Sequence, residues 1–332
     1  MTINTDDQPW TPASGPIINP NGNPLAGTID FAGDTDLFRI QMQQDVGYVI
    51  RVTGAADAQL QLYTPGFFPA GAVVELPDET FVYFVADVDA VYFVEVISGG
   101  WATGAYSISA GTAFFHLGVA GADFMSGVDG ADIFNSLHGN DVAMGGGGDD
   151  FIDGGAGIDT ASFTGLRSNY AVQVHGDSVL TVTANAGNEG QDVLRNVERL
   201  DFSDGGRAFD LEGNAGIVAR TLGAVFGAQA VSNDVYAGIG LSLVDSGTSY
   251  EALMQLALDA VLGGDATHEE VATLLYTNLV GTPSAPDLEA IVDLLENGTF
   301  THSTLGVMAA NTTLNASNIG WEALVFAGLG YM

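Results

Sequence analysis

Five aspartates recur every nine residues, each two places after a glycine and two places before an apolar residue. The aspartates are Asp123, Asp132, Asp141, Asp150 and Asp159, and the glycines are Gly121, Gly130, Gly139, Gly148 and Gly157. The segment from Gly118 to Ser162 holds eight Asp and no Lys, Arg or Glu. Neighbouring carboxylates repel by about 4 kcal/mol per pair at about 4 Å and an effective dielectric of about 20. A hard cation with about six to eight oxygen ligands removes that penalty, so the spacing predicts calcium in preference to magnesium.

The glycines and the apolar places predict how the backbone presents these carboxylates. Glycine allows the positive φ angles through which loop carbonyls turn inward. The apolar place of each unit then lies on a short strand and points into a narrow core. Its occupants are Met125, Phe134, Ala143, Ile152 and Ala161. A flexible Gly/Asp-rich linker is the alternative, and without calcium we expect the segment to be disordered.

The five units, GVAGADFMS, GVDGADIFN, SLHGNDVAM, GGGGDDFID and GGAGIDTAS, resemble the nonapeptide G-G-x-G-x-D-x-U-x of RTX proteins, in which U is apolar. The resemblance implies a calcium-bound parallel β-roll in which two units make one coil. It implies about three ions, between Asp123 and Asp141, between Asp141 and Asp159, and between Asp132 and Asp150. The third unit departs from the family pattern, because Ser136 and Leu137 replace its glycine pair.

Composition limits the partners and the compartment. The 332 residues suggest two or three domains. The net charge is −34, the seven basic residues are all Arg, and none follows Arg220. Binding to nucleic acid is excluded because it needs a basic surface, and attraction to anionic lipid is poor. Binding of acidic glycans through bridging calcium ions is still compatible with this charge.

The chain has no cysteine and no basic-apolar leader at its start, MTINTDDQPW, and no apolar stretch of transmembrane length. If the chain is secreted, bound metal ions would therefore have to provide the cross-links that disulfide bonds provide in other secreted proteins. An acidic, cysteine-free chain with Gly/Asp repeats resembles substrates of bacterial type I secretion, which carry an uncleaved signal near the C-terminus. The end GWEALVFAGLGYM is compatible with such a signal. We expect an extracellular or cell-surface location, where calcium is high enough to fold the repeats.

The N-terminal part divides into an extended arm, 1–25, and an all-β domain, 26–112. The arm is either disordered or a strand donated to a neighbouring subunit. Alternating apolar residues and turn signals indicate a sandwich or jelly roll. The expected strands are Asp36–Met42, Tyr48–Thr53, Gln59–Tyr63, Thr80–Val88, Ala90–Ile97 and Ala105–Ser109.

The strings GTIDFAGDTDLFRI, YVIRVTG, LQLYTPG, VYFVEVISG and GAYSISA resemble the bacterial pre-peptidase C-terminal domain, a β-sandwich appended to secreted enzymes. Some members of that group bind calcium or polymers. Asp34 and Asp36 would then hold one more metal ion, or they only shape a turn. The aromatic residues are either a ligand platform or core, and core is the expectation at strand spacing. They are Phe67, Phe68, Phe81, Tyr83, Phe84, Tyr92 and Phe93.

The repeats form a predicted β-roll, 113–163, followed by a β cap, 164–212, and an α-helical domain, 213–332. Cap strands are expected at Tyr170–Val174, Val179–Thr183, Asp192–Val197 and Arg199–Phe202. DVLRNVERLDFSDG resembles the segment after RTX repeats in secreted proteins, and it would cover the open sheet edge. Three arginines cluster in this region, and they either offset the acidic roll or are solvated: Arg195, Arg199 and Arg207.

About six helices are expected in the last domain, with Ser249 as an N-cap and Thr267 and Glu270 as a capping box. The first and last of them are predicted at Ala215–Gln229 and Ile319–Leu329. The block LLYTNLVGTPSAPDLEAIVDLLENGTF resembles a domain family of unknown function, numbered 4214, that occurs beside RTX repeats. That resemblance implies no chemistry.

Catalytic motifs are missing from the sequence. HEEVA at His268 has no second histidine at helical spacing, and neither G-x-S-x-G nor a Walker A loop occurs. The histidines are spread along the chain and are expected to be surface or packing residues. The prediction is therefore a multidomain β plus α protein that is not an enzyme. We expect a secreted, calcium-dependent structural protein of the cell surface or matrix that self-associates. A glycan-binding or fibre-binding adhesin and an unrecognised hydrolase, or its accessory fragment, are the alternatives.

Overall fold

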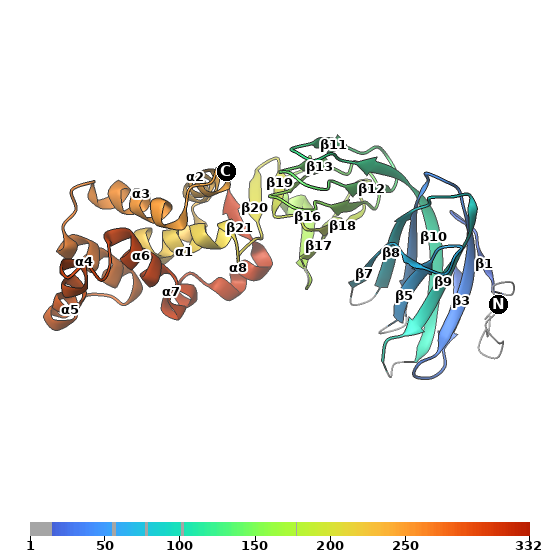
Figure 1. Cartoon of the computed structure of the whole chain (residues 1–332), viewed down its shortest axis with the longest axis horizontal. Helices are drawn as coiled ribbons and strands as arrows, with labels where there is room; N and C mark the ends of the chain where they lie inside the picture. The colour runs from blue at the N-terminus through green and yellow to red at the C-terminus, as the bar shows by residue number, and fades with distance from the viewer. Residues whose placement is uncertain (1–14, 55–57, 77–78, 101–102, 177) are drawn as a thin grey trace. The chain divides into compact units, whose positions relative to one another are not determined.

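The computed structural model describes residues 15–54, 58–76, 79–100, 103–176 and 178–332. The chain divides into two compact units (Figure 1). The first unit contains Met1–His138, Ala143–Gly155 and Ala186–Arg195, and the second contains Gly139–Val142, Ala156–Asn185 and Asn196–Met332. Strands come first, the repeats form a β-solenoid-like region, and helices dominate the C-terminal part, as predicted. The finer domain boundaries stay predictions.

The first unit holds two sheets. One has the order β1-β3-β9-β5-β6, with β1 parallel to β3 and the other pairs antiparallel. The other runs β14-β12-β10-β4-β8-β7, with β2 beside β10 and β18 beside β14. The strands of the first sheet are β1 (Ile17–Ile18), β3 (Thr35–Met42), β5 (Ala58–Tyr63), β6 (Pro69–Ala70) and β9 (Ala90–Ser98). Those of the second are β2 (Leu25–Ile29), β4 (Gly47–Thr53), β7 (Ala72–Leu76), β8 (Glu79–Val85), β10 (Gly104–Leu117), β12 (Asp132–Asn135), β14 (Phe151–Asp153) and β18 (Gln191–Arg195).

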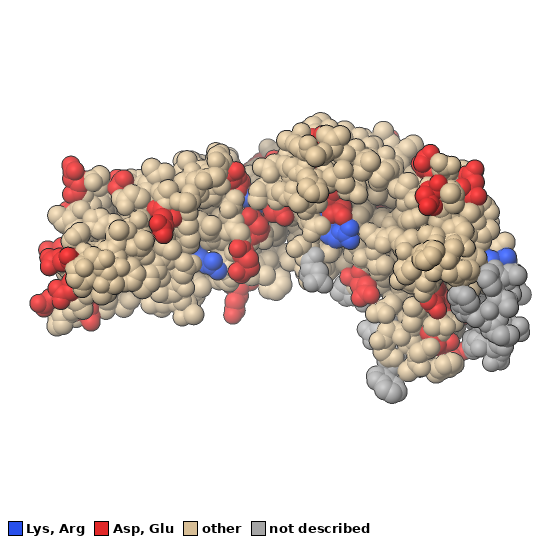
Figure 2. Space-filling model, viewed as in Figure 1, with Lys and Arg blue, Asp and Glu red and all other residues tan. Residues whose placement is uncertain are grey.

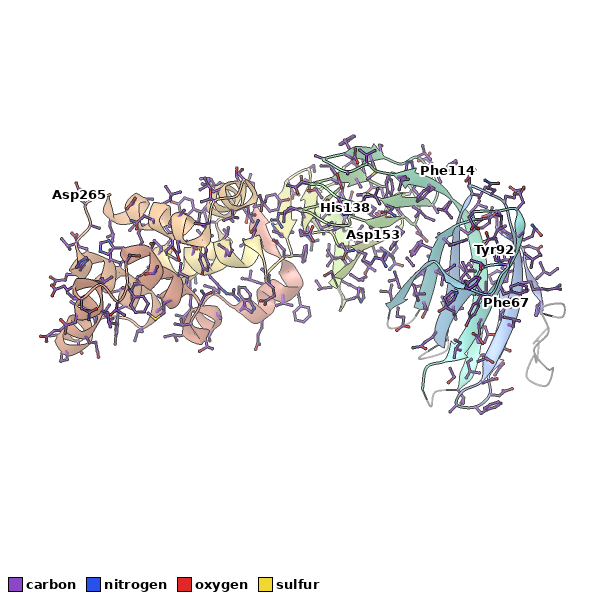
Figure 3. The ribbon with its side chains drawn as sticks, viewed as in Figure 1. Phe67, Tyr92, Phe114, His138, Asp153 and Asp265 are labelled. Atoms are coloured by element: carbon purple, nitrogen blue, oxygen red, sulfur yellow. The ribbon has the colours of Figure 1, made fainter. Side chains whose placement is uncertain are left out.

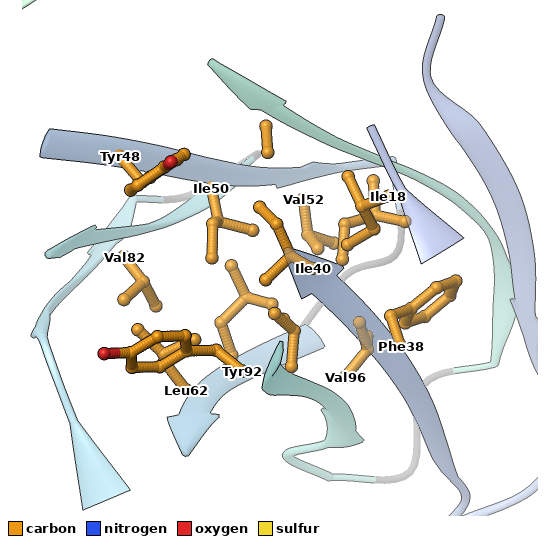
Figure 4. Close-up of a cluster of buried hydrophobic side chains, with 14 of the residues drawn as sticks. Ile18, Phe38, Ile40, Tyr48, Ile50, Val52, Leu62, Val82, Tyr92 and Val96 are labelled. Carbon is orange, nitrogen blue, oxygen red and sulfur yellow. The ribbon is translucent and has the colours of Figure 1, made fainter. Parts of the chain in front are cut away.

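Both sheets contribute to one hydrophobic core (Figure 4). The predicted alternation is confirmed on β3, β4 and β5, because their inward residues are buried. They are Phe38, Ile40, Met42, Tyr48, Ile50, Val52, Leu60 and Leu62. Most of the aromatic group is core as well, since Phe81, Tyr83, Tyr92 and Phe93 are buried. Figure 3 labels Tyr92 and Phe67, which belong to this part of the chain.

Strand β10 extends further than predicted. It was expected to end at Ser109, before a glycine, but it continues for 14 residues to Leu117. Ser107 to Ala113 pair antiparallel with β4, and Phe114 to Leu117 pair in parallel with β12. Strand β4 continues to pair with β10 at Gly111, so this glycine does not end the strand. One strand therefore belongs both to the N-terminal sheets and to the repeats.

Part of the predicted extended arm, 1–25, forms strands in the structure. Residues 1–14 lie outside the described residues. Ile17 and Ile18 form β1, and Leu25 begins β2. Ile18 is buried in the core, so its burial stabilises a segment whose proline and glycine content indicated a loop.

The second unit holds a sheet of β15, β19, β20 and β21 and a hairpin of β16 and β17. The strands are β15 (Thr160–Ser162), β16 (Tyr170–Val174), β17 (Val179–Ala184), β19 (Arg199–Phe202), β20 (Gly205–Ala208) and β21 (Leu329–Tyr331). The remaining repeat strands are β11 (Phe124–Ser126) in the first unit and β13 (Val142–Met144), which spans the division. The predicted strands at Tyr170 and Arg199 are confirmed, whereas β20 and β21 were not predicted.

Eight α-helices follow among the described residues. They are α1 (Asn214–Phe226), α2 (Asp234–Asp245), α3 (Tyr250–Leu262), α4 (His268–Leu279), α5 (Ala285–Glu296), α6 (His302–Ala310), α7 (Thr313–Asn318) and α8 (Trp321–Ala327), with 3-10 turns at Arg167–Asn169 and Ala228–Ser232. Helix α1 is central, since its buried residues belong to two core clusters. The Ser249 cap and the Thr267–Glu270 capping box are confirmed.

Two helix predictions are wrong at their C-terminal ends. Gly227 has φ +85° and ends α1, so the predicted stretch to Gln229 is a 3-10 turn. Gly328 ends α8, and Leu329 begins β21 on the edge of β20. None of the described helices is both long and apolar enough to cross a bilayer.

Candidate metal centre

Three acidic side chains form a ladder in the first unit. The N–H of Asp132 donates to Oδ1 of Asp150 at 2.9 Å, and the N–H of Asp150 donates to Oδ1 of Asp192 at 3.0 Å. All three residues are buried. The ladder lies where parallel strands β12, β14 and β18 begin, so each carboxylate repeats the position of the one before it. The structure thus brings the predicted pair Asp132 and Asp150 together.

A second acidic ladder lies in the second unit. The N–H of Asp141 donates to Oδ1 of Asp159 at 2.8 Å, and the N–H of Asp159 donates to Oε2 of Glu198 at 2.8 Å. Asp141 and Asp159 are buried. The predicted pair Asp141 and Asp159 is therefore also brought together, and Glu198 extends it.

Asp123 accepts a hydrogen bond from the N–H of Val119 at 2.6 Å, within its own loop. It lies in the first unit and Asp141 in the second, so an ion between these two stays a prediction. The third nonapeptide, SLHGNDVAM, has a structural cost, because Leu137 takes φ +70° where the nonapeptide pattern has glycine.

Two of the repeat glycines, Gly148 and Gly157, are required by close backbone approach. A Cβ on Gly148 would lie 2.4 Å from the carbonyl oxygen of Gly130, and one on Gly157 would lie 1.7 Å from that of Gly139. Both glycines have positive φ. All five predicted glycines, including Gly121, share that conformation, so the prediction of positive φ at these places is confirmed. That the loop carbonyls turn inward stays a prediction.

Two carboxyl groups of the first ladder, those of Asp150 and Asp192, have strongly raised pKa values. Burial, with the Asp132 and Asp149 carboxylates adding to it, raises the pKa of Asp150 to about 7. Burial, followed by repulsion from Asp150, raises the pKa of Asp192 to about 9. Burial also raises the pKa of Glu198 in the second ladder. At Asp150 and Asp192 the neighbouring carboxylates add to the effect of burial, because like charges disfavour the ionised form. Arg199 opposes the rise in the pKa of Glu198, and Nε2 of His116 lies 2.6 Å from Oδ1 of Asp132.

Arginine side chains form ion pairs with acidic residues outside the two ladders. Arg51 pairs with Asp149 at 3.0 Å, and Arg195 pairs with Asp153, which Figure 3 labels. Arg199 is not solvated, because it is buried between Asp210 and Asp245. In the view of Figure 2, acidic groups are scattered over the surface and basic groups are few, in keeping with the net charge of −34.

The ladders fit a hard cation. Oδ2 of Asp150 is buried and has no hydrogen-bond partner in the part of the chain that the structure describes. Among these described residues, no group of three or more His, Cys, Asp or Glu side chains is placed to hold one metal ion, so further ligands would be backbone carbonyls. Calcium accepts carboxylates and carbonyls in irregular cages. Neighbouring pairs within a ladder, such as Asp132 with Asp150 or Asp141 with Asp159, would supply the carboxylates.

Asp34 and Asp36 are both buried in the first unit and have protein partners. Oδ2 of Asp34 accepts the N–H of Asp30 at 2.8 Å and so closes a turn. Oδ2 of Asp36 accepts the hydroxyl of Tyr106. These contacts are those expected for the turn-shaping alternative, and a metal ion at Asp34 and Asp36 stays a prediction.

Three features of the structure were not predicted from the sequence. Asp192 and Glu198 extend the two ladders. For Asp192 the spacing within one repeat was present, at Gly190, Asp192 and Leu194, but the nine-residue period was interrupted. His268 and His302 are far apart in the chain, yet Nδ1 of one lies 2.7 Å from Nε2 of the other. Only the packing of α4 against α6 reveals that pair.

Comparison with known proteins yields no match to a family model or to a curated protein. Among solved structures, the extracellular lipase LipA of Serratia marcescens is 23% identical, with a TM-score of 0.25 over 27% of this chain and 14% of the lipase. The pre-peptidase C-terminal domain of a Bacillus anthracis collagenase is 17% identical, with a TM-score of 0.27 over 31% of this chain and 99% of that domain. PliG of Aeromonas hydrophila, a periplasmic lysozyme inhibitor, is 13% identical, with a TM-score of 0.23 over 29% of this chain and 99% of its own.

Proposed function

We propose that this chain is a secreted, calcium-dependent structural protein of the cell surface or extracellular matrix that associates with further copies of itself. The observation that carries the proposal is the buried stack of Asp132, Asp150 and Asp192. Buried carboxylates in such a stack are stable when protonated or when a cation lies among them. Calcium is scarce in the cytosol and plentiful outside, so it would fold the repeats after export.

Self-association is supported by an apolar edge at the first coil of the repeats. Among the described residues, Phe114 to Leu117 of β10 pair with β12 on one side only, since the pairing with β4 ends at Ala113. Strand β11 is likewise the first strand of its sheet. We call the exposed side chains around these strands the apolar edge, and they are Phe114, Leu117, Val119, Phe124 and Val128.

Unpaired strand edges with exposed apolar side chains recruit further strands. A second copy of the chain would offer the same edge, so two copies could pair about a twofold axis. Figure 3 labels Phe114 on β10 at this edge. Calcium and association are then linked, because the part of the apolar edge that lies in the repeats, Val119, Phe124 and Val128, is ordered only when the coil is folded.

The test is sedimentation of the full chain with calcium and with excess chelator, combined with electron microscopy. We expect larger species in calcium and a slower, less compact monomer in chelator. Phe124→Ser should reduce association, whereas Phe326→Ser, on α8, should not, although the two side chains are similarly exposed at 70% and 68%. A compact monomer in both conditions would refute the proposal.

A glycan-binding adhesin is the second candidate, on the strength of one turn in the first unit. Phe67 has φ +60° and stacks on Phe93 with ring centroids 4.5 Å apart. The next residue, Phe68, is 71% exposed. An exposed ring on such a turn suits stacking against a sugar face. Saturable binding on a glycan array that Phe68→Ala abolishes would favour this function.

A further inference from the structure

Residues 187–195, GNEGQDVLR, repeat the nonapeptide pattern outside the contiguous array. Gly187 stands at the first place, Gly190 at the fourth, Asp192 at the sixth and Leu194 at the eighth. The fifth unit ends at Ser162, so other sequence intervenes before this pattern returns. A single unit at that distance gives no periodic signal.

Strand pairing places this segment in register with the array. On β12 and β14, Phe134 is opposite Ile152, and on β14 and β18, Ile152 is opposite Leu194. All three side chains are buried. They form one column of eighth-place residues on parallel strands. The step from Asp132 to Asp150 is 18 residues, and the step from Asp150 to Asp192 is 42, so 42 − 18 = 24 residues have been inserted into one coil.

The loops stack in the same way as the strands. The N–H of Gly148 donates to the carbonyl of Asn188 at 2.8 Å, and the N–H of Gln191 donates to Oδ1 of Asp149 at 3.0 Å. Gly190 has φ +68°, and a Cβ there would lie 2.5 Å from the carbonyl oxygen of Gly148. Gly148 approaches Gly130 at 2.4 Å by the same measure. The loop 187–190 therefore lies on the loop 145–148 much as that loop lies on 127–130.

We infer that residues 187–195 are a sixth unit of the β-roll, which resumes after an inserted hairpin, and that its loop and the loop 145–150 hold an additional calcium ion. The inference rests on the proposed function, since it assumes that the repeats bind calcium. Asp192 is buried, and its Oδ1 already accepts the N–H of Asp150. The second carboxylate oxygen of Asp150 is buried without a hydrogen-bond partner among the described residues. Backbone carbonyls of the two loops would complete the ligand set.

The experiment counts calcium ions on the full chain by native mass spectrometry and equilibrium dialysis. Asp192→Asn keeps an oxygen that can accept the N–H of Asp150 but removes the charge, so we expect one ion fewer than in the wild type. Glu189→Gln is the matched control, because it removes a charge from the same loop outside the ladder. We expect the control to bind the same number of ions as the wild type.

Hydrogen exchange on the wild type keeps the test valid if a variant fails to fold. Calcium should protect the amides of 187–195 together with those of 145–150. Calcium binding without protection of 187–195, and with an unchanged ion count in Asp192→Asn, would overturn the sixth unit and leave the proposed function standing. Failure of the wild type to bind calcium at all would overturn both.

Discussion

In the absence of calcium, acid should stabilise the first unit. The pKa of Asp150 is raised to about 7 in the folded chain, against an ordinary value of 3.8. The folded chain therefore binds more protons than the unfolded chain between these two values. The free energy of unfolding must fall as the pH rises through this window and must recover as the pH falls.

The magnitude follows from the shift of Asp150. Roughly three pH units at about 1.36 kcal/mol each give roughly 4 kcal/mol lost between pH 4 and pH 8. Asp192, with a pKa of about 9, extends the loss to higher pH. A proton thus does part of what a calcium ion would do, because each removes the repulsion of the stacked carboxylates.

The assay is urea unfolding followed by circular dichroism, at pH 5.5 and pH 8.5, after calcium has been removed on a chelating resin. Asp150→Asn should be more stable than the wild type at pH 8.5 without calcium and less stable with it. Asp265→Asn, at an exposed position, controls for the general effect of net charge. The reasoning is refuted if the calcium-free wild type is as stable at pH 8.5 as at pH 5.5, or if Asp150→Asn keeps the full pH dependence.

Three further substitutions test the packing by urea unfolding. Gly148→Ala should cost about 2 kcal/mol more than Gly130→Ala, because both have positive φ but only Gly148 has backbone within 3 Å of its Cβ position; equal costs would count against the close approach. Phe151→Ala should cost about 4 kcal/mol, because its buried ring stacks on Tyr83 with centroids 4.0 Å apart, and a loss below about 1 kcal/mol would contradict that packing. Arg199→Ala should cost about 3 kcal/mol, since it leaves two carboxylates facing each other in a largely buried site, and a more stable variant would show that desolvation of the arginine outweighs its ion pairs.

Periodic features of the molecule could be predicted from the sequence. Alternation identified the inward faces of β3, β4 and β5, and the spacing of glycine and aspartate identified the paired carboxylates. Local capping chemistry identified the start of α4 at Thr267. In each case the pattern and the structure depend on residues that are close in the chain or regularly spaced.

Features set by distant partners could not be predicted. Helix α2 contains Gly238 and Gly240, which lower helix propensity, but a Cβ on Gly240 would lie 2.7 Å from Val218 of α1. The glycine is there for helix packing, which the local sequence does not reveal. Strand β21 exists because β20 offers an edge, although more than a hundred residues separate the two. Asp192 could not be predicted as a repeat residue, because the inserted residues interrupt the nine-residue period.

Strand β10 gives the repeats a starting template. Its first half is fixed by β4 and β2, so Phe114 to Leu117 present an ordered edge before any coil has formed. The first turn of a linear repeat is the costly one, because it orders the backbone before neighbours contribute contacts. An edge that is already in place lowers this nucleation cost and sets the direction of growth. Folding of the repeats should therefore proceed from β10 toward β18, and the calcium concentration that triggers it should be lower than for the same repeats cut free of β10.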